Sequence, residues 1–487
     1  MTAETLIFAT STPLFVPQLI EINLYPYLTW VFYGALLFLS PFFFQRDKRF
    51  FSLFLVSLAL ETAFVIDVGF FIRPSYILGL ILIARTVGHG LQFPARYTVL
   101  LSLFALIGLT GVFLNLDLLG KAQSGESRAT FLRPLIQMGQ LTTMILIAAA
   151  VFTNLRRKQF FLTLVRVLHW VAVSVAVAAL YELAAIYFHL PYLNLNNMLP
   201  EYWYPGFGSP LGYIVRARVT FIEPIELNNF QMFGLASSLS YGVLWGKKGW
   251  RYWSLILLQL IPFIGTFSRS TLLTTFVLVP VLILFYPRAI KSSLGFVVDR
   301  VIRVVVVALL IFLVHFSLTA TPQQIRQSNP LIETLFTRLI LHRSEDDLLK
   351  PWGRAKADEE VQALVSDGRL SFGVGIGNEA NWWGGIGGTY NIYNQIIIYT
   401  GLIGFLIFFI FLSSLLFGLF QNYWSKVNDL ALRRVSWIFF IGLVGIMVQR
   451  LSFSGLLTDT YLWVAFAVAA YLGQVKSSID LYQVNKS

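Results

Sequence analysis

Three arginines, Arg216, Arg218 and Arg269, are suited to bind phosphate beside a membrane. Each stands next to a long apolar run, and an arginine that enters hydrocarbon is costly unless an anionic partner meets it. A guanidinium keeps its charge at physiological pH, and its planar fork can hold two phosphate oxygens at once. Chemistry on a phosphate group at the membrane surface is therefore the first function that these residues suggest.

The first stretch, RARVTFIEPIELNNF, brings two of these arginines together with two acids. Arg216 and Arg218 are followed by Glu223 and Glu226, just before a predicted membrane helix. The residues fit a phosphate site with a nearby carboxylate that could take up a proton. A local ion-pair cluster at the membrane interface is the alternative.

The second stretch, GTFSRSTLLTTF, places Arg269 between two serines and two apolar runs with almost no loop between them. This arginine is therefore expected at a membrane boundary, where it faces protein or water rather than lipid. The alternative is an arginine whose charged end extends to the interface from a helix that faces lipid.

The third stretch, GVGIGNEANWWGGIGGTYNIYNQIIIYTGLIGF, is rich in glycine. It has neither the strand–turn–helix context of a Rossmann motif nor the lysine of a P-loop, so the glycines do not predict a nucleotide site. We interpret it as a flexible lid that feeds into a helix opening near Tyr390 and Asn391. Gly401 and Gly404 would then permit close helix contact. Trp382 and Trp383 are candidates to hold sugars.

The sequence predicts no metal centre and no cofactor. Cysteine is absent, and the five histidines show no ligand spacing. The run from Arg343 to Asp347 could hold a divalent ion, although a solvated charge run is the simpler interpretation.

Composition predicts an all-α polytopic membrane protein with about 12–14 transmembrane helices, since long apolar runs recur along the chain. Of the 487 residues, 57% are hydrophobic and only 12% are charged. The net charge of +12 lies mainly in loops between apolar runs, which argues against nucleic-acid binding. The predicted spans are roughly 27–44, 50–72, 74–90, 97–117, 134–154, 160–187, 228–245, 252–268, 270–287, 304–320, 391–419, 437–451 and 458–474.

Five basic loops fall on one side of this arrangement, which is the cytoplasmic side by the positive-inside rule. Their basic residues are Arg46/Lys48/Arg49, Arg156/Arg157/Lys158, Lys247/Lys248/Arg251, Arg288/Lys291/Arg300/Arg303 and Lys426/Arg433/Arg434. The chain is then a single transmembrane domain, 1–487, with two long periplasmic loops at 188–227 and 321–390. The second loop is expected to carry short interfacial helices, a turn at Asp367–Gly368 and the glycine-rich lid.

The three stretches, in this order, resemble the bacterial O-antigen ligase and O-antigen polymerase superfamily, which are GT-C-type membrane glycosyltransferases. Arg216 resembles an arginine that precedes a Phe-x-x-Pro in that family, and Arg269 with Leu273 resembles its Arg-x3-Leu pattern. Asn391, Gly401 and Gly404 resemble the ligase pattern His-[Asn/Ser/Gln]-x9-Gly-x2-Gly. The resemblance covers roughly residues 200–410.

One position departs from the ligase pattern. Tyr390 stands where the ligases have histidine. A tyrosine cannot act as a base near pH 7 without a large shift of its pKa, but it can donate a hydrogen bond. This departure favours a polymerase over a ligase.

The resemblance implies a bacterial inner-membrane enzyme that works at the periplasmic face, without a metal. Its donor would be an undecaprenyl-diphosphate-linked glycan and its acceptor a second glycan, with a chain-length regulator protein as an open further partner. Arg216 and Arg269, supported by Arg218, would stabilise the leaving diphosphate. Glu223 or Glu226 would accept the acceptor's proton, while Tyr390 and Asn391 orient groups.

Two alternatives remain. A ligase would hand finished glycan to a lipid or protein acceptor. A transporter or flippase for lipid-linked sugars would use charges within the spans, such as Glu61, Asp67 and Arg166.

Overall fold

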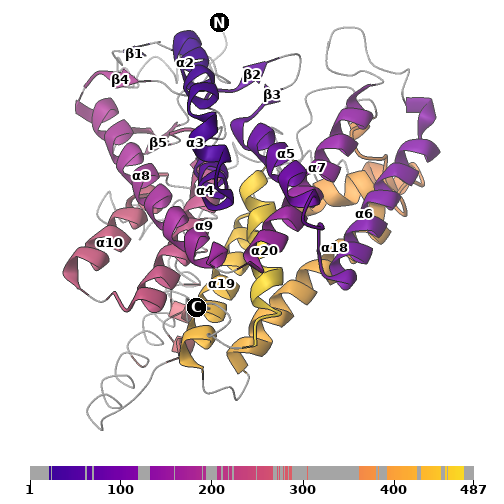
Figure 1. Ribbon diagram of the computed structural model, residues 1–487. Coiled ribbons are helices and arrows are strands. Elements are labelled where there is room, and N and C mark those ends of the chain that lie inside the picture. The colour runs from indigo at the N-terminus through magenta and orange to yellow at the C-terminus, as the bar shows by residue number, and fades with distance from the viewer. Residues whose placement is uncertain are drawn as a thin grey trace, which may run out of the picture.

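The computed structural model describes most of the helices and part of the connections. The described residues are 21–22, 25–60, 63–67, 71–118, 132–157, 159–188, 190–193, 206–209, 212–215, 217, 219–221, 224–247, 249–266, 361–379, 382, 392–424, 429–450, 456–457 and 459–476, with isolated residues between 271 and 304. Helices dominate this part of the chain (Figure 1).

The helices follow the apolar runs of the sequence. They are α2 (Tyr25–Phe38), α3 (Ser40–Phe44), α4 (Asp47–Ser57), α5 (Pro74–Val87), α6 (Ala95–Leu114), α7 (Leu132–Leu155), α8 (Phe160–Phe188), α9 (Pro224–Trp245), α10 (Trp250–Gly265), α18 (Ile392–Trp424), α19 (Leu430–Gln449) and α20 (Thr460–Leu472), with a 3₁₀ turn at Leu116–Leu118. Five of them, α6, α7, α8, α18 and α19, are long and apolar enough to cross a membrane. The chain is therefore a helical membrane protein, as the composition predicts.

Short strands join some of the helices. They are β1 (Glu21–Ile22), β2 (Ile66–Asp67), β3 (Phe71–Ile72), β4 (Tyr192–Leu193), β5 (Gly206–Ser209) and β6 (Gly212–Val215). The parallel pair is β1–β4, and the antiparallel pairs are β2–β3 and β5–β6. The hairpin β5–β6 ends directly before Arg216, so it leads the chain into the first arginine stretch.

The predicted span at 50–72 is wrong beyond Ser57. Helix α4 ends there, and the hairpin β2–β3 occupies the second half of the run. The β-branched Val65, Ile66 and Val68, followed by Gly69, suit a hairpin better than a helix, although their hydropathy is the same in either form. Asp67, counted above as a charge within a span, therefore lies in a strand.

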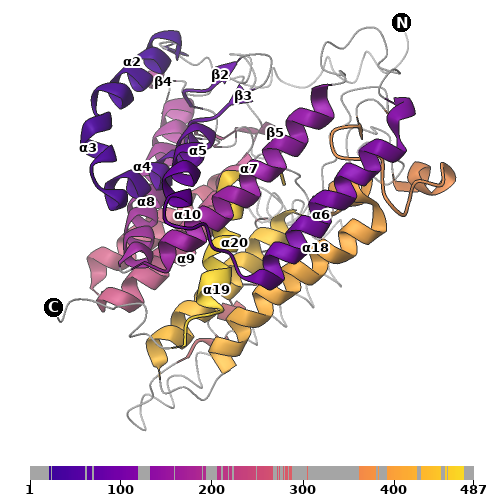
Figure 2. The same cartoon turned by 45° about the vertical axis from the view of Figure 1, so that its right-hand side comes forward.

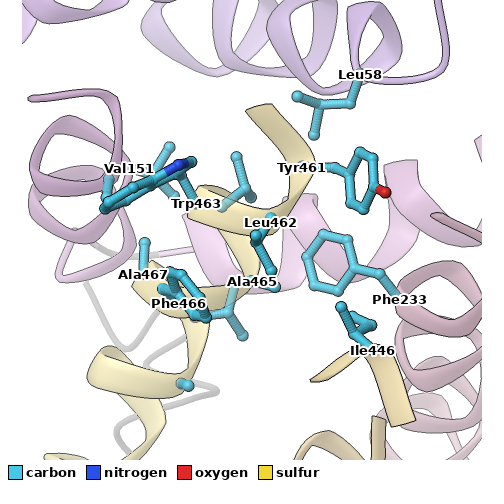
Figure 3. Close-up of a cluster of buried hydrophobic side chains, with 14 of the residues drawn as sticks. Leu58, Val151, Phe233, Ile446, Tyr461, Leu462, Trp463, Ala465, Phe466 and Ala467 are labelled. Carbon is cyan, nitrogen blue, oxygen red and sulfur yellow. The ribbon is translucent and has the colours of Figure 1, made fainter. Parts of the chain in front are cut away.

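Helix α20 forms the centre of the bundle (Figures 1 and 2). All of its residues are buried, and it packs against α7, α18 and α19. Figure 3 shows Trp463 and Phe466 of α20 in the same cluster as Val151 of α7, Phe233 of α9 and Ile446 of α19. Because all of its side chains are buried, α20 is a core helix and not one at the lipid boundary.

Helices α6 and α18 run side by side along one flank (Figure 2). Aromatic pairs such as Phe104–Phe408 and Tyr97–Phe411 join them. Large apolar side chains on their outer faces stay exposed, including Leu103, Leu106, Leu406, Phe409 and Phe417. In a membrane these faces meet lipid tails.

Basic loops predicted on one side come together in pairs. The Asp47 carboxylate lies 2.5 Å from Arg85 Nη2 and 3.0 Å from Arg157 Nη1, and Lys48 donates a hydrogen bond to Gln159. Elsewhere Arg434 donates to the Pro287 carbonyl over 2.8 Å, which joins the last basic loop to the one that begins at Arg288. That this side is cytoplasmic remains a prediction.

The glycine-rich loop is packed where it is described, which differs from the flexible lid expected above. Residues 373–378 are buried, and Gly373, Gly375 and Gly377 all have positive φ. A methyl group at Gly375 would overlap the backbone of Gly111 and Val112 in α6, and one at Gly377 would overlap Pro134 in α7. These glycines are required because the loop backbone touches helix backbone.

Gly401 is needed for a similar reason. It breaks the helical geometry within α18, with φ of 64° and ψ of −170°, and a methyl group there would overlap Ser371 of the loop. Gly404 instead leaves room for the Thr400 side chain of its own helix. The expected close contact is therefore real at Gly401, but the partner is the loop and not another helix.

Substitutions at two glycines separate backbone strain from close packing. Gly375→Ala should destabilise the protein by several kcal/mol, since both the positive φ and the overlap with α6 oppose a side chain. Gly368→Ala is the matched control, because Gly368 has φ of 68° but no atom within 4 Å of an added methyl group. It should cost only about 1–2 kcal/mol. Thermal unfolding in detergent measures both, and equal losses would contradict the packed loop.

Acid should weaken the Asp47 contact. The hydrogen bond from Arg85, followed by the charges of Arg85 and Arg157, holds the pKa of Asp47 below its ordinary value of 3.8. A lowered pKa stabilises the folded state above the ordinary pKa, and this contribution is lost as pH falls through the folded value. Because the side chain is 38% exposed, Asp47→Asn should cost only about 1 kcal/mol or less at pH 7. The difference in melting temperature between the two proteins should shrink towards pH 3.

Candidate polar core and arginine stretches

A buried ion pair lies where α19 ends and α20 begins. Arg450 follows the last residue of α19 and is fully buried, as is Asp459, the residue before α20. The Arg450 guanidinium donates hydrogen bonds to the Asp459 carboxylate and, over 2.6 Å, to the Tyr461 hydroxyl. Tyr461 in turn donates to Asp459 over 3.2 Å. The three side chains form a closed network in the protein interior.

Two further charged residues belong to this group. Arg73, directly before α5, places Nη1 3.8 Å from Asp459 Oδ1 and is 3% exposed. Glu226 in the first turn of α9 is 2% exposed and interacts electrostatically with Arg450. Two arginines and two carboxylates give no net charge. This balance matters because an uncompensated buried charge is strongly destabilising.

The chain beside the first two arginines is held against the end of α10. The Ala217 amide, between Arg216 and Arg218, donates to the Gly265 carbonyl over 3.3 Å. Asn228 of α9 donates to the hydroxyls of Thr266 and Thr271, which stand on either side of Arg269 in the sequence. The described neighbours of all three arginines therefore meet around the start of α9. Arg216, Arg218, Glu223 and Arg269 themselves lie outside the described residues.

The segment 217–221 contains a residue with an unusual backbone conformation. Val219 has φ of 52°, a region that β-branched residues rarely adopt. Its amide donates to Glu182 of α8 over 2.7 Å, and the Thr220 hydroxyl donates to the Ala59 carbonyl. Backbone strain of this kind costs about 1–3 kcal/mol and is concentrated at functional sites. The backbone on either side of Arg218 is thus held at Ala217, Val219 and Thr220 by contacts to three different segments.

The first turn of α18 reaches the same region. This helix opens at Ile392, one residue after Asn391, close to the predicted start. The Tyr393 hydroxyl donates to the Met447 carbonyl near the end of α19 over 3.0 Å. The third stretch of the sequence therefore approaches Arg450 from another side. Tyr390, Asn391 and Trp383 lie outside the described residues.

Buried amides continue the polar layer along α9 and α19. Asn229 and Gln449 are fully buried, and neither side chain has a hydrogen-bond partner among the described residues. A methyl group at Gly445 would touch Met232, and one at Gly442 would touch Ala236. This antiparallel register brings Asn229 and Gln449 to the same level. Such groups are costly in an apolar core, and the described residues leave the hydrogen-bonding capacity of both side chains unfilled.

Trp382 is placed by two hydrogen bonds. Its indole nitrogen donates to Asp367 over 2.9 Å, and its backbone amide donates to the Asn378 carbonyl over 2.9 Å. The predicted turn at Asp367 is confirmed, since residues 361–366 are helical and Gly368 has positive φ. Trp382 is therefore held on the packed glycine-rich loop.

An apolar pocket lies between α9, α10, α19 and the segment that carries Leu278 and Leu282. It is an open groove, and the space in it, counted out into the surroundings, is about 450 Å³. Its lining is apolar and includes Leu239, Leu260, Phe263, Leu278 and Ile441. Phe263 precedes Gly265 by two residues, so the pocket begins near the Ala217 hydrogen bond.

Arg450, Asp459 and Arg73 were not singled out from the sequence. A signal was present, since Arg450 falls inside the predicted span 437–451 and Asp459 inside 458–474, and charges within spans are seldom accidental. Arg166, which the sequence offered for a transporter, lies over the Trp245 ring at 5.1 Å. Glu61 lies outside the described residues. Within the described ranges no three acidic or histidine side chains are grouped to hold a metal ion.

In comparisons with known proteins, the chain matches no family model and no curated protein.

Removing one member of the central ion pair should be far more harmful than removing a surface cap. Asp459→Asn leaves buried arginines without their carboxylate and should cost about 3–5 kcal/mol. Asp429→Asn is the control, because Asp429 also stands before a helix, where it accepts the Leu432 amide over 3.1 Å. Its loss should cost about 1 kcal/mol. Unfolding in detergent measures both, and similar values would contradict a central role for Asp459.

Proposed function

We propose that this protein is a membrane glycosyltransferase that moves a glycan from a polyprenyl diphosphate to a sugar hydroxyl. The observation that carries the proposal is the convergence of the arginine stretches, through Ala217 on Gly265 and Asn228 on Thr266 and Thr271. Arginines that are far apart in the sequence are thereby tied to neighbouring backbone. A diphosphate has enough oxygens to engage more than one guanidinium.

In this proposal the reaction needs no metal. As the glycosidic bond breaks, negative charge grows on the departing diphosphate. Arg216 and Arg269, supported by Arg218, would stabilise that charge where it develops. The apolar pocket beside Gly265 offers room for the lipid next to the diphosphate. Because the groove is open, a lipid tail that starts in it could extend into the bilayer.

The acids predicted for proton transfer differ in what surrounds them. Glu226 is buried and interacts with Arg450, which suits a role in positioning the start of α9. Glu223 remains a candidate by its place beside Pro224 in the sequence. Tyr390 and Asn391, just before α18, would orient substrate groups by hydrogen bonds, and Trp382 and Trp383 would contact sugars.

The motifs described above favour a polymerase of surface polysaccharide, such as O-antigen, capsule or exopolysaccharide, in a bacterial inner membrane. The donor would be an undecaprenyl-diphosphate-linked glycan and the acceptor a second lipid-linked glycan, at the periplasmic face or cell exterior. A ligase is the second candidate, and Tyr390 in place of histidine argues against it. Product analysis separates the two, since a ladder on undecaprenyl diphosphate indicates a polymerase and glycan on another acceptor indicates a ligase.

A flippase belongs to a different class and is separated by an assay in detergent. Glycan transfer persists without a sealed membrane, whereas transport does not. The donor for this assay is lipid-linked glycan extracted from cells that lack the protein.

Arginine substitutions test the proposal directly. Arg216→Ala or Arg269→Ala should each slow transfer by about 10²–10³-fold, the cost of losing one donor to a developing anion. Arg→Lys should rescue poorly, because an ammonium cannot bind two oxygens in the same plane. Arg251→Ala, which removes an exposed arginine from a basic loop, should leave the rate unchanged. Normal polymer from well-folded Arg216 and Arg269 variants would overturn the assignment.

A further inference from the structure

Helix α18 is divided by its break at Gly401 into a front segment, 392–400, and a rear segment, 402–424. In an unbroken helix the amides of Leu402 and Ile403 would donate to carbonyls four residues earlier in the same helix. Here the Leu402 amide donates to the Leu370 carbonyl over 2.8 Å, and the Ile403 amide donates to the Ser371 carbonyl over 3.3 Å. The first amides of the rear segment therefore bind the glycine-rich loop.

The front segment binds the same stretch of the loop, 370–374. The Val374 amide donates over 2.8 Å to the carbonyl of Ile398, which the Leu402 amide would take in an unbroken helix. A methyl group at Gly373 would overlap that carbonyl oxygen. The backbone of the loop thus replaces hydrogen bonds that the break removes, and it lies too close to the helix for a side chain.

Helix α6 holds this stretch of the loop from another side. Asn115, the residue after α6, donates to the Gly373 carbonyl over 3.0 Å. Ile376 is fully buried, and a methyl group at Gly108 of α6 would overlap its side chain. The loop is therefore fixed between α6 and the break, so the bend of α18 is set by its neighbours and not by α18 alone.

The length of α18 indicates that the bend lies near a membrane boundary. The helix has 33 residues, whereas a span needs about 20. The rear segment is long enough to cross the hydrocarbon, so the front segment extends beyond it. There the Tyr393 hydroxyl donates over 3.0 Å to the carbonyl of Met447, three residues before Arg450. The bend thus directs the front segment to the end of α19.

Side chains fix the other end of the front segment. The Tyr399 hydroxyl donates to Glu379 Oε1 over 3.3 Å, and the same oxygen lies 2.7 Å from Arg133 Nη2 of α7. Gln395 donates to the Tyr399 hydroxyl over 3.1 Å. The front segment is therefore held by α19 at one end and by the loop, together with α7, at the other.

We propose that residues 370–374 are a positioning element, which keeps a fixed bend in α18 throughout the transfer reaction. The inference rests on the proposed function, in which Tyr390 and Asn391, directly before the front segment in the sequence, orient substrate groups. A loop that opened as a lid would leave peptide groups of the loop and of α18 unpaired. Such groups are costly in the interior and at the edge of a bilayer. The bend therefore stays in place while substrates bind and leave.

Leu402→Pro tests the proposal by separating the loop from α18. Leu402 is the first residue of the rear segment, a position where proline suits a helix. The proline ring removes the hydrogen bond to Leu370 and fills the space in front of that carbonyl. In the purified full-length protein, kcat for transfer from lipid-linked glycan should fall by about 10- to 10²-fold with a smaller change in KM, because reacting groups are misplaced and not lost.

Leu402→Ala is the matched control. It keeps the amide and shortens a side chain that is 45% exposed. This variant should transfer at the wild-type rate.

Amide hydrogen exchange reports on the bend without any assay of transfer. Exchange in peptides that cover 370–374 and 398–403 should be slow in the wild type and in Leu402→Ala, and faster in Leu402→Pro. Addition of the lipid-linked donor should leave the wild-type exchange unchanged. Faster exchange in the presence of the donor would show a loop that opens, and would overturn the fixed bend.

A disulfide locks the same contact. The chain has no cysteine, and Ser371 and Ile403 are exposed residues whose backbones are joined by a hydrogen bond. Ser371→Cys with Ile403→Cys should therefore form a disulfide on oxidation, since the two Cα atoms are close enough. The oxidised protein should transfer as fast as the reduced one, and in a Leu402→Pro background oxidation should restore most of the lost transfer. Ser371→Cys alone controls for the oxidant.

The outcomes distinguish the two proposals. Absence of transfer by the wild-type protein would overturn the proposed function, and hydrogen exchange would still test the fixed bend. Near-normal transfer by Leu402→Pro, equal losses in Leu402→Pro and Leu402→Ala, or a loss of transfer on oxidation that a reductant reverses would overturn the positioning role alone. Absence of the disulfide after oxidation would contradict the contact itself.

Discussion

The buried ion pair between Arg450 and Asp459 is the constraint on which the centre of this protein depends. Taking two ions out of water costs several kcal/mol each, and only close contact and a complete set of hydrogen bonds offset that cost. Asp459 is the residue from which the fully buried helix α20 starts. Because its carboxylate must meet Arg450, the pair fixes how α20 enters the bundle between the ends of its neighbours.

The same constraint extends to two more helices. Arg73 precedes α5, and Glu226 lies in the first turn of α9, so each charge that balances the pair also fixes one helix end. Asn228 follows on α9 and binds the two threonines that flank Arg269. The electrostatic balance of the interior and the placement of the arginine stretches therefore depend on one short segment of α9. A charge lost at Arg450 would therefore affect the placement of the arginine stretches without touching them directly.

Hydropathy was enough to predict the helices whose apolar runs have one stable form in a bilayer. The bounds of α5 to α10 and of α18 to α20 lie within a few residues of the predicted spans, apart from α19, which starts seven residues early at Leu430. The hydropathy prediction failed in the second half of the run 50–72. Apolar β-branched residues give the same mean hydropathy whether they form a helix or a hairpin. Glycine content revealed the third stretch, but a sequence cannot show whether the glycines permit motion or close backbone contact. The structure shows that Gly373, Gly375 and Gly377 permit close backbone contact.

The least predictable feature was which charged side chains pair with one another across the bundle. Arg450 and Asp459 are visible as charges in apolar runs, yet Arg73 and Glu226 come from opposite ends of the first half of the chain. Glu379 stands in a motif that drew attention for its glycines and tryptophans, and nothing in the sequence connects it with Arg133. Pairing of this kind follows from helix packing, which cannot be predicted from a single sequence by hydropathy and motifs.

Charge balance also bears on the proposed binding of a diphosphate. In the described core, Arg73 and Arg450 are balanced by Asp459 and Glu226, and Arg133 is balanced by Glu379. Among the described residues, neither group has a surplus of positive charge. Positive charge from the amino end of α18 amounts to only about half an elementary charge. In the proposed function, a doubly charged lipid diphosphate would therefore require further cations near the start of α9. Arg216, Arg218 and Arg269 are the residues whose neighbours in the chain converge there.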